Sequence, residues 1–299
     1  MIELSFLKKD HFAKECPVSY EKKWITENKK IDILQDDLFD VQSDNSSWSM
    51  ETEEIHEEPT KNGWIDVYER ESVLRMVVNA IGNDGKIIVE FGASVGYMIG
   101  EMKKELPGNY YIATDLMNEG LKQSFHKNPD IMHVRCGITD APFENESIDF
   151  VFSLNVLEHI EDDEKAISEC YRMLRHGGAA LFVVPRGDDL YDYFDEVLFH
   201  KRRYSKGELI KKCRNAGFIV EKNDHIAWLC YPFFWLKKKK NRHDGIDLSY
   251  EEKVERVKSD VKNGMGSTVA QMLIRVEKCL SSIIRPSFGV RELVLLSKE

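Results

Sequence analysis

From Lys86 onward, short apolar runs alternate with segments whose apolar residues recur every three or four positions. Such runs predict strands, and such periodic segments predict amphipathic helices. Strands alternating with helices are typical of the α/β class, here a doubly wound, seven-stranded, mostly parallel sheet covered on both faces. The predicted strands are 87–91, 110–115, 131–136, 148–155, 179–185, 218–222 and 291–299, and the predicted helices are 65–81, 96–106, 117–127, 162–175 and 205–217.

Two helix ends are predicted from local chemistry. The helix over 162–175 precedes Gly177-Gly178, a position where a left-handed C-terminal cap is common. Ser205 is predicted to cap the N-terminus of the following helix, since a serine hydroxyl can accept a hydrogen bond from a free backbone N–H.

Two regions fall outside this alternation. Residues 1–64 are predicted to form an N-terminal extension, solvated and partly irregular, because they lack apolar periodicity and the stretch from Asp36 to Glu58 carries nine acids without a Lys or Arg. Residues 65–299 are predicted to form the main domain. Its insertion at about 225–287 is expected to form a lid over the substrate.

The insertion begins with an aromatic run, Ile226 to Leu236, and continues with four lysines, Lys237 to Lys240. Two interpretations stay open: core residues beneath the lid, the more usual origin of such a run, or a surface that contacts anionic lipid head groups. A helix follows with one apolar face, expected to lie in the lid core or in a dimer contact. That face consists of Met265, Val269, Met272, Leu273, Val276, Leu280 and Ile283.

Composition narrows the classes of function. A formal net charge of −10 disfavours duplex nucleic acid as a partner, because its binding relies on Lys and Arg to neutralise phosphates. Six scattered cysteines without a C-x-x-C pair indicate reduced thiols in a cytoplasmic protein, and neither a zinc site nor any other metal site is expected. Glu3 and Lys8-Lys9 argue against a signal peptide. The longest apolar run is about half the ~20 residues of a membrane span.

The loop after the first core strand indicates a ligand site. Small residues at Gly92, Ser94 and Gly96 let a ligand approach the free N–H groups that open the next helix. Dinucleotide-binding loops have glycines at positions one, three and six, whereas position six here is Tyr97. Glu90 would repel a pyrophosphate but suits a ligand with an amino group or a sulfonium. A nicotinamide oxidoreductase is therefore disfavoured.

At these residues the sequence resembles the class I S-adenosylmethionine-dependent methyltransferases, in the branch that acts on small molecules, quinones and sugars. The resemblance covers about residues 67–224 and the closing strand, and implies a Rossmann-like methyltransferase fold with S-adenosyl-L-methionine as cofactor. The chain departs from the family pattern at Ser94, which replaces the middle glycine. The motifs, in family order, are VEFGASVGY, IATDL, GITDAPFENESIDFVFSLNVLEHIED, CYRMLRHGGAALFVVP and HKRRYSKGELIKKCRNAGF.

The resemblance implies a cofactor site residue by residue. The glycine loop would line the methionine end, and Asp115 would accept hydrogen bonds from both ribose hydroxyls, a task that suits an acceptor-only carboxylate. Leu116 would pack on the adenine. Asp140 and Ala141 would meet the adenine amino edge, although Asp140 also fits an ordinary turn. The implied set is Glu90, Gly92, Ala93, Ser94, Gly96, Asp115, Leu116, Asp140, Ala141, and, beneath the methionine portion, Asn155 and Val156.

Methyl transfer needs a nucleophile held in line with the cofactor and, for a hydroxyl, a base to take its proton. His159 and His200 are the candidate catalytic residues, with a loop-orienting role for His159 and a surface role for His200 as alternatives. Arg202, Arg203 and Tyr204 are candidate substrate contacts, because Arg matches phosphate or carboxylate geometry. Charges that merely balance nearby acids are the alternative for the arginines.

The sequence thus predicts a cytoplasmic methyltransferase that acts on oxygen in a small molecule or glycan intermediate, with or without a polyprenyl or nucleotide carrier. An N-methyltransferase of a small amine stays open. So does a catalytically inactive scaffold module, because Ser94 departs from the family loop. Contact of the lid with a membrane also stays open, and the sequence does not predict an oligomeric state.

Overall fold

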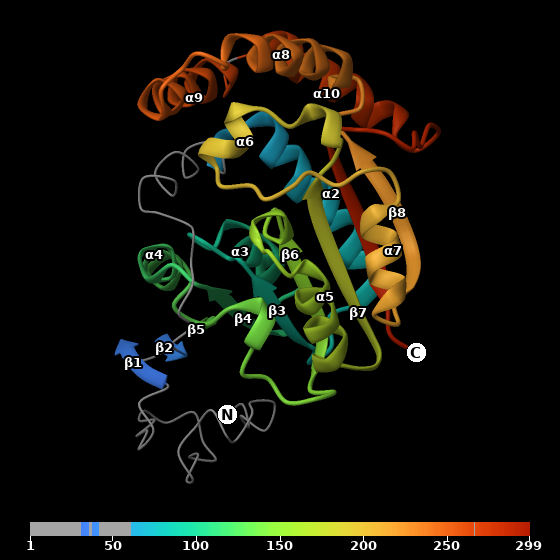
Figure 1. The fold of residues 1–299 in the computed structure, drawn as a ribbon. Coiled ribbons are helices and arrows are strands. Elements are labelled where there is room, and N and C mark those ends of the chain that lie inside the picture. The colour runs from blue at the N-terminus through green and yellow to red at the C-terminus, as the bar shows by residue number, and fades with distance from the viewer. Residues whose placement is uncertain (1–30, 36–37, 42–60, 266) are drawn as a thin grey trace.

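The computed structural model describes residues 31–35, 38–41, 61–265 and 267–299. Figure 1 shows a central twisted sheet with helices on both faces and a further helical layer above one end. The strands are β1 (Ile31–Gln35), β2 (Leu38–Val41), β3 (Ile87–Phe91), β4 (Tyr110–Asp115), β5 (Met132–Arg135), β6 (Ile148–Leu154), β7 (Leu174–Pro185), β8 (Ile219–Ile226) and β9 (Arg291–Ser297). The α-helices are α2 (Trp64–Ile81), α3 (Tyr97–Glu105), α4 (Asn118–Lys127), α5 (Asp163–Met173), α6 (Tyr193–Val197), α7 (Glu208–Asn215), α8 (Tyr231–Asp244), α9 (Tyr250–Met265) and α10 (Thr268–Leu280), with short 3-10 turns η2 (Ile138–Asp140), η3 (Leu157–His159) and η4 (Asp188–Leu190).

The strand order is β1-β2-β5-β4-β3-β6-β7-β9-β8. The strands from β2 to β7 in this order pair in parallel, whereas β9 is antiparallel to both of its neighbours. The predicted seven-stranded, mostly parallel sheet is therefore confirmed as β3 to β9. The sequence did not predict β1 and β2, which form an antiparallel pair at the β5 edge. Most of the predicted extension, residues 1–64, lies outside the described residues.

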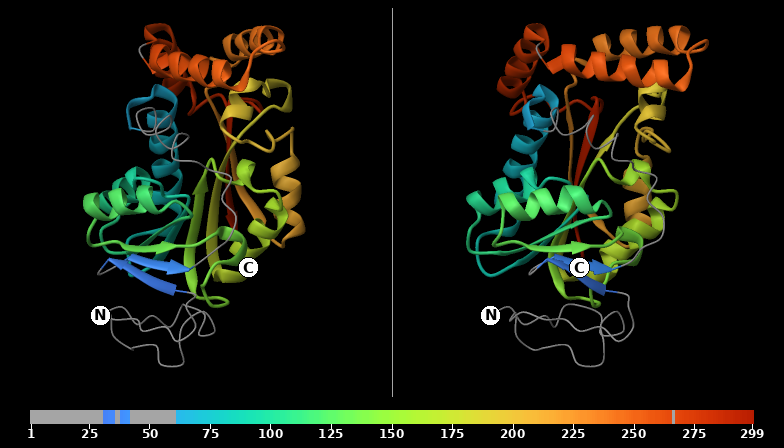
Figure 2. Two further views of the ribbon diagram at one scale, coloured as in Figure 1. Left: turned by 60° about the vertical axis from the view of Figure 1, so that its left-hand side comes forward. Right: turned by 90° about the vertical axis from the view of Figure 1, so that its left-hand side faces the viewer.

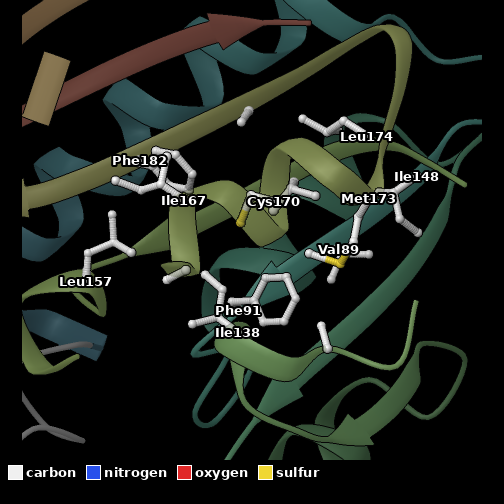
Figure 3. Packing of buried hydrophobic residues seen from close by; sticks show 14 of the residues in the cluster. Val89, Phe91, Ile138, Ile148, Leu157, Ile167, Cys170, Met173, Leu174 and Phe182 are labelled. Atoms are coloured by element: carbon white, nitrogen blue, oxygen red, sulfur yellow. The ribbon is translucent and has the colours of Figure 1, made fainter. Parts of the chain in front are cut away.

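Alternating side chains divide the core between the two faces of the sheet. Val89 and Phe91 pack in the cluster that α5 and α7 cover, and Figure 3 shows them in this cluster together with Ile167 and Phe182. Ile88, one position away, packs with residues of α2 and α3 on the opposite face. Glu90 points to that same face by strand parity, which takes its carboxyl group toward the first turn of α3.

Two helix ends differ from the prediction. Helix α5 ends at Met173 and β7 begins at Leu174, so Gly177, with φ +74°, lies within the strand, where its N–H donates to the Lys298 carbonyl. Helix α7 is capped by Gly207 and not by Ser205. The Ser205 N–H and hydroxyl both donate to Glu208 Oε2, at 3.0 and 2.9 Å, so the carboxylate occupies the hydroxyl that was expected to cap.

The insertion forms three helices, α8, α9 and α10, which Figure 2 shows as a layer spanning the top of the molecule beyond α2 and α6. Only part of the predicted apolar face of α10 packs in a core: Leu273 packs against the core, whereas Val269 and Met272 are 61% and 67% exposed. The buried face carries Ile274 and Glu277 instead. Glu277 turns inward because its carboxylate accepts hydrogen bonds from the Ala227 and Leu229 N–H groups, at 2.7 and 2.9 Å.

Of the described residues, no helix is both long and apolar enough to span a bilayer.

Candidate active site

The turn between β3 and α3 is shaped by close contacts that only glycine permits at two positions. Gly92 has φ +76°, and a Cβ atom there would lie 2.2 Å from Val156 Cγ2. Gly96 has φ +75°, and a Cβ atom there would lie 2.1 Å from Ser124 Oγ. Ser94 adopts φ +43°, a region that residues other than glycine seldom occupy. The turn therefore has no space for a side chain at Gly92 or Gly96.

Asp115, at the end of β4, fixes the turn from the side. Its Oδ2 accepts a hydrogen bond from the Ser94 N–H and its Oδ1 accepts one from the Met117 N–H, both at 2.8 Å. The carboxylate is thus positioned by backbone donors, and it is an acceptor-only group of the kind that can bind the hydroxyl groups of a ligand.

Glu90 supplies a buried acid beneath the turn. Its side chain is 3% exposed, and Oε2 accepts a hydrogen bond of 3.1 Å from the N–H of Ile99 in the first turn of α3. Burial raises the pKa of Glu90 well above its ordinary value, and nearby Asp115 adds to the shift. A cationic ligand in contact with this carboxyl group would favour its ionised form.

A cavity of about 1060 Å³ extends from this turn to helices α8, α9 and α10, the predicted lid. That volume is slightly above the usual range for ligand pockets, about 300–1,000 Å³. Among the predicted site residues, it is lined by Glu90, Gly92, Ala93, Ser94, Asp115, Leu116, Asn155, Val156, His159, His200 and Arg203. Within the described part of the chain, Gly96, Asp140, Ala141, Arg202 and Tyr204 are outside this lining, although Ile138 and Thr139, just before Asp140, belong to it.

Arg202 and Tyr204 are held away from the cavity by Asp163. Arg202 Nη1 contacts Asp163 Oδ1 at 2.8 Å, and the Tyr204 hydroxyl donates to Asp163 Oδ2 at 2.6 Å. Lys212 Nζ also contacts Asp163 Oδ2, at 2.7 Å. This cluster ties α5 to α7, and its geometry gives no support to the predicted substrate contacts of Arg202 and Tyr204. Arg203 does border the cavity.

His200 forms a dyad with a buried carboxylate. Its Nδ1 lies 2.8 Å from Asp195 Oδ1, which assigns the proton to Nδ1 and leaves Nε2 as the acceptor. Burial lowers the pKa of His200, and Asp195 offsets only part of that effect. Burial opposes ionisation of Asp195 too, but Arg203 and Lys238 hold the pKa of Asp195 well below its ordinary value. At neutral pH, a neutral imidazole therefore faces an ionised carboxylate.

The lid takes part in this dyad through one of its lysines. Lys238 of α8 is buried, with Nζ 3.0 Å from Asp195 Oδ2 and 2.6 Å from Asp192 Oδ1. Asn241 Nδ2 donates to Asp192 Oδ2 at 2.7 Å. Lys238 is therefore not part of a lipid-facing surface. Lys237 is half exposed and pairs with Asp260 at 3.1 Å.

Glu158 is a buried acid beside His159 and His200. Unlike the two histidines, it was not predicted from the sequence. It is fully buried, and neither carboxylate oxygen has a hydrogen-bond partner among the described residues. Burial raises the pKa of Glu158 to about 8. The His159 and His200 rings meet edge to face, with centroids 4.7 Å apart. The potential ligand atoms of Glu158, His159 and His200 lie within 4.8 Å of one another, a donor set that could also accept a divalent cation.

A second polar wall comes from α2 and β9. Arg291 contacts Glu69 Oε2 at 2.5 Å and Asp66 Oδ1 at 2.7 Å. The Asn155 side chain donates to both Glu69 oxygens, at 2.9 and 3.2 Å. Asn155 adopts φ +53°, which asparagine tolerates better than most residues. These side chains border the cavity and hold the end of β6 against α2.

The fold and the site together define an α/β protein with a candidate ligand cavity at the carboxyl ends of its parallel strands. Residues 89–182 match the methyltransferase domain family. Over 142 residues the chain is 30% identical to a probable S-adenosylmethionine-dependent methyltransferase of Mycolicibacterium smegmatis. The aligned segment covers 46% of this chain and 53% of that protein. It is 26% identical over 185 residues to phosphoethanolamine N-methyltransferase 1 of Zea mays, covering 58% and 33% of the two chains.

A solved structure shows the same fold. Phosphoethanolamine N-methyltransferase 2 of Haemonchus contortus, in complex with S-adenosyl-L-methionine, aligns with a TM-score of 0.52 at 15% identity, covering 84% of this chain and 60% of that one. The chain spans about half the length, or less, of the curated relatives described above. Residues 89–182 are thus similar to a methyltransferase domain, and the relatives of this domain include proteins named for their dependence on S-adenosylmethionine as cofactor.

The residues present fit that cofactor. Gly92, whose backbone packs closely against Val156, lies in the same cavity lining as the doubly anchored carboxylate of Asp115. Glu90 places a buried acid in the same lining, which suits a ligand that carries a sulfonium and an ammonium group. Ser94 does not close the turn, because its side chain replaces a hydrogen atom without removing the N–H contact to Asp115.

Proposed function

We propose that the chain catalyses methyl transfer from S-adenosylmethionine to a hydroxyl oxygen of a small molecule or glycan intermediate. The observation that carries the proposal is the Asp195–His200 dyad, because His200 lines the same cavity as the turn after β3. When bound, the cofactor supplies a methyl group on a cationic sulfur, and its carbon–sulfur bond breaks as the new carbon–oxygen bond forms.

In this proposal, His200 Nε2 takes the proton of the acceptor hydroxyl as the new bond forms. Asp195 keeps the proton of the resting imidazole on Nδ1 and stabilises the imidazolium that results. Lys238 and Arg203 keep Asp195 ionised, so the dyad does not collapse to a neutral carboxylic acid. The lid helices that border the cavity exclude water from the reacting atoms.

An N-methyltransferase is the second candidate. Relatives named as phosphoethanolamine N-methyltransferases support it, and so does Glu158, a buried acid that could bind an ammonium group. The two candidates differ in the product. A hydroxyl acceptor yields a methyl ether or ester, whereas an amine acceptor yields a methylated amine.

The test combines cofactor binding with identification of the product. Calorimetry with S-adenosylmethionine and its demethylated product establishes the cofactor site, and mass spectrometry of cell extract incubated with methyl-labelled cofactor identifies the acceptor. Replacing His200 with Ala should reduce turnover by about 10²–10⁴-fold while cofactor affinity is kept. The matched control is His243→Ala, since the His243 side chain is 88% exposed on α8. Full activity of the His200 variant would refute its role as base, and cofactor binding without turnover on any extract would favour a scaffold module.

A further inference from the structure

The lid presents large apolar side chains to the cavity instead of burying them. Phe233 of α8 is 58% exposed and Val269 of α10 is 61% exposed, yet both border the cavity that contains the cofactor turn. Exposed apolar side chains scattered over a surface are ordinary, but apolar side chains that line a cavity indicate an apolar occupant.

The packing of the lid shows that these two side chains do not complete its core. Phe234, next to Phe233, meets the Trp64 ring edge to face at 6.1 Å and packs in the core cluster. On α10, the inward face is occupied by Ile274 and by the Glu277 carboxylate, which is bound to two backbone N–H groups. Lys238 and Asn241 anchor α8 to Asp192. Because these contacts fix the rotation of both helices, Phe233 and Val269 face the cavity.

The lining of the same cavity combines polar and apolar side chains. Glu158, His159 and His200 gather at one part of it, within reach of one another. Helix α2 contributes Trp64 and Ile65, and the predicted lid contributes Phe233, Val269 and Leu273 beside the polar side chains of Lys237 and Asp260. A single occupant that satisfies both kinds of lining carries a polar reacting group and an apolar body.

We propose that the methyl acceptor is an amphiphile, with its hydroxyl at His200 and an apolar chain or ring system held between α8 and α10. This inference rests on the proposed methyltransferase function. Each methylene that enters the lid end should raise affinity by about fourfold, the equilibrium equivalent of burying one CH₂ group. A small, fully polar acceptor would leave Phe233 and Val269 facing water.

Calorimetry with hexyl, octyl and decyl β-D-glucosides tests this, each kept below its micelle-forming concentration. The protein is the full chain, saturated with S-adenosylhomocysteine. We expect affinity to rise with chain length in the wild type. In Phe233→Ser and Val269→Ser the gain per methylene should fall at least twofold, whereas Ile283→Ser should behave as wild type because Ile283 is 81% exposed and does not line the cavity. Unchanged thermal melting of all three variants would confirm that they fold.

The outcomes separate the two levels of the proposal. Failure of S-adenosylhomocysteine to bind the wild type would overturn the proposed function itself. Binding of S-adenosylhomocysteine with glucoside affinities that do not depend on chain length would overturn only the amphiphilic acceptor. An equal loss in Ile283→Ser would show non-specific adsorption and overturn it too. Two further results would do the same: dimers in solution that Val269→Ser dissociates, or phosphatidylglycerol vesicles that bind the protein through Met272 and Ile283 when the monomeric glucosides do not bind.

Discussion

Replacing Asp195 with Asn tests the electrostatic account of the site without changing the shape of the side chain. Asp195 is fully buried and contacts three nitrogen atoms: Arg203 Nε at 2.7 Å, His200 Nδ1 at 2.8 Å and Lys238 Nζ at 3.0 Å. Removing one partner of a buried ion pair costs about 3–5 kcal/mol, because the remaining charge is left without compensation. Lys238 keeps its contact with Asp192, so we expect a loss near the lower end, about 3 kcal/mol at pH 7.

The pH dependence of that loss has a definite sign. The pKa of Asp195 is depressed in the folded protein, so its contribution to stability is full above the unfolded-state pKa of about 3.9. It is lost as the pH falls through the lower folded-state pKa. The difference between wild type and variant should therefore be largest at neutral pH and shrink progressively below about pH 4.

Urea unfolding measures the loss, and histidine NMR titration measures the effect on the dyad. Asp195 raises the pKa of His200 against the effect of burial, so the variant should show a lower His200 pKa and a weaker preference for the proton on Nδ1. Glu196→Gln is the control, because Glu196 is half exposed in its pair with Lys253 and should change stability by less than about 1 kcal/mol. A loss below about 1 kcal/mol for Asp195→Asn, together with an unchanged His200 titration, would refute the reasoning.

Three further outcomes follow from the turn after β3. Gly92→Ala should lower the free energy of unfolding by about 2–4 kcal/mol, because it combines an unfavourable positive φ with a clash against Val156. A loss below about 1 kcal/mol in urea unfolding would contradict the close contact between Gly92 and Val156. Ser94→Gly should raise stability by about 0.5–1 kcal/mol, since relief of the left-handed conformation slightly exceeds the added entropy of the unfolded chain; a loss would show that the serine side chain stabilises the turn. The affinity for S-adenosylmethionine should rise as the pH rises through the raised pKa of Glu90, because the cationic ligand favours the ionised carboxylate. Calorimetry should find no such pH dependence in Glu90→Gln. An equal dependence in both proteins would assign it to another group.

Periodicity predicted most of the fold because it reports which residues pack on the sheet. The run Ile148–Leu154 is apolar at nearly every position, and it forms a central strand buried on both faces. The predictions at Ser205 and Gly177 were wrong because neighbouring groups compete for the same hydrogen bonds, Glu208 in one case and the closing strand in the other. Such competition is not visible in a local pattern.

The site was predicted in part for the same reason. Gly92 and Glu90 could be singled out because a turn after a buried strand requires particular residue types at fixed positions, and Asp115 was implied by the family resemblance. Glu158 could not, since an acid in the segment "LEH" is usually exposed, whereas here its side chain is buried and its backbone carbonyl accepts a hydrogen bond from the N–H of Lys201, 43 residues later in the chain. The rotation of α10 was also hidden, because it depends on Glu277 reaching N–H groups about 50 residues away in the chain.

The most direct test of the central claim is calorimetric titration of the full chain with S-adenosylmethionine, compared with the Asp115→Ala variant. We expect one binding site per chain, and a loss of about 1.5–3 kcal/mol in the variant, because Asp115 would no longer accept charge-assisted hydrogen bonds from the ribose. Absence of binding to the wild type, or equal affinity of wild type and variant, would contradict the claim that the turn after β3 and the end of β4 hold this cofactor.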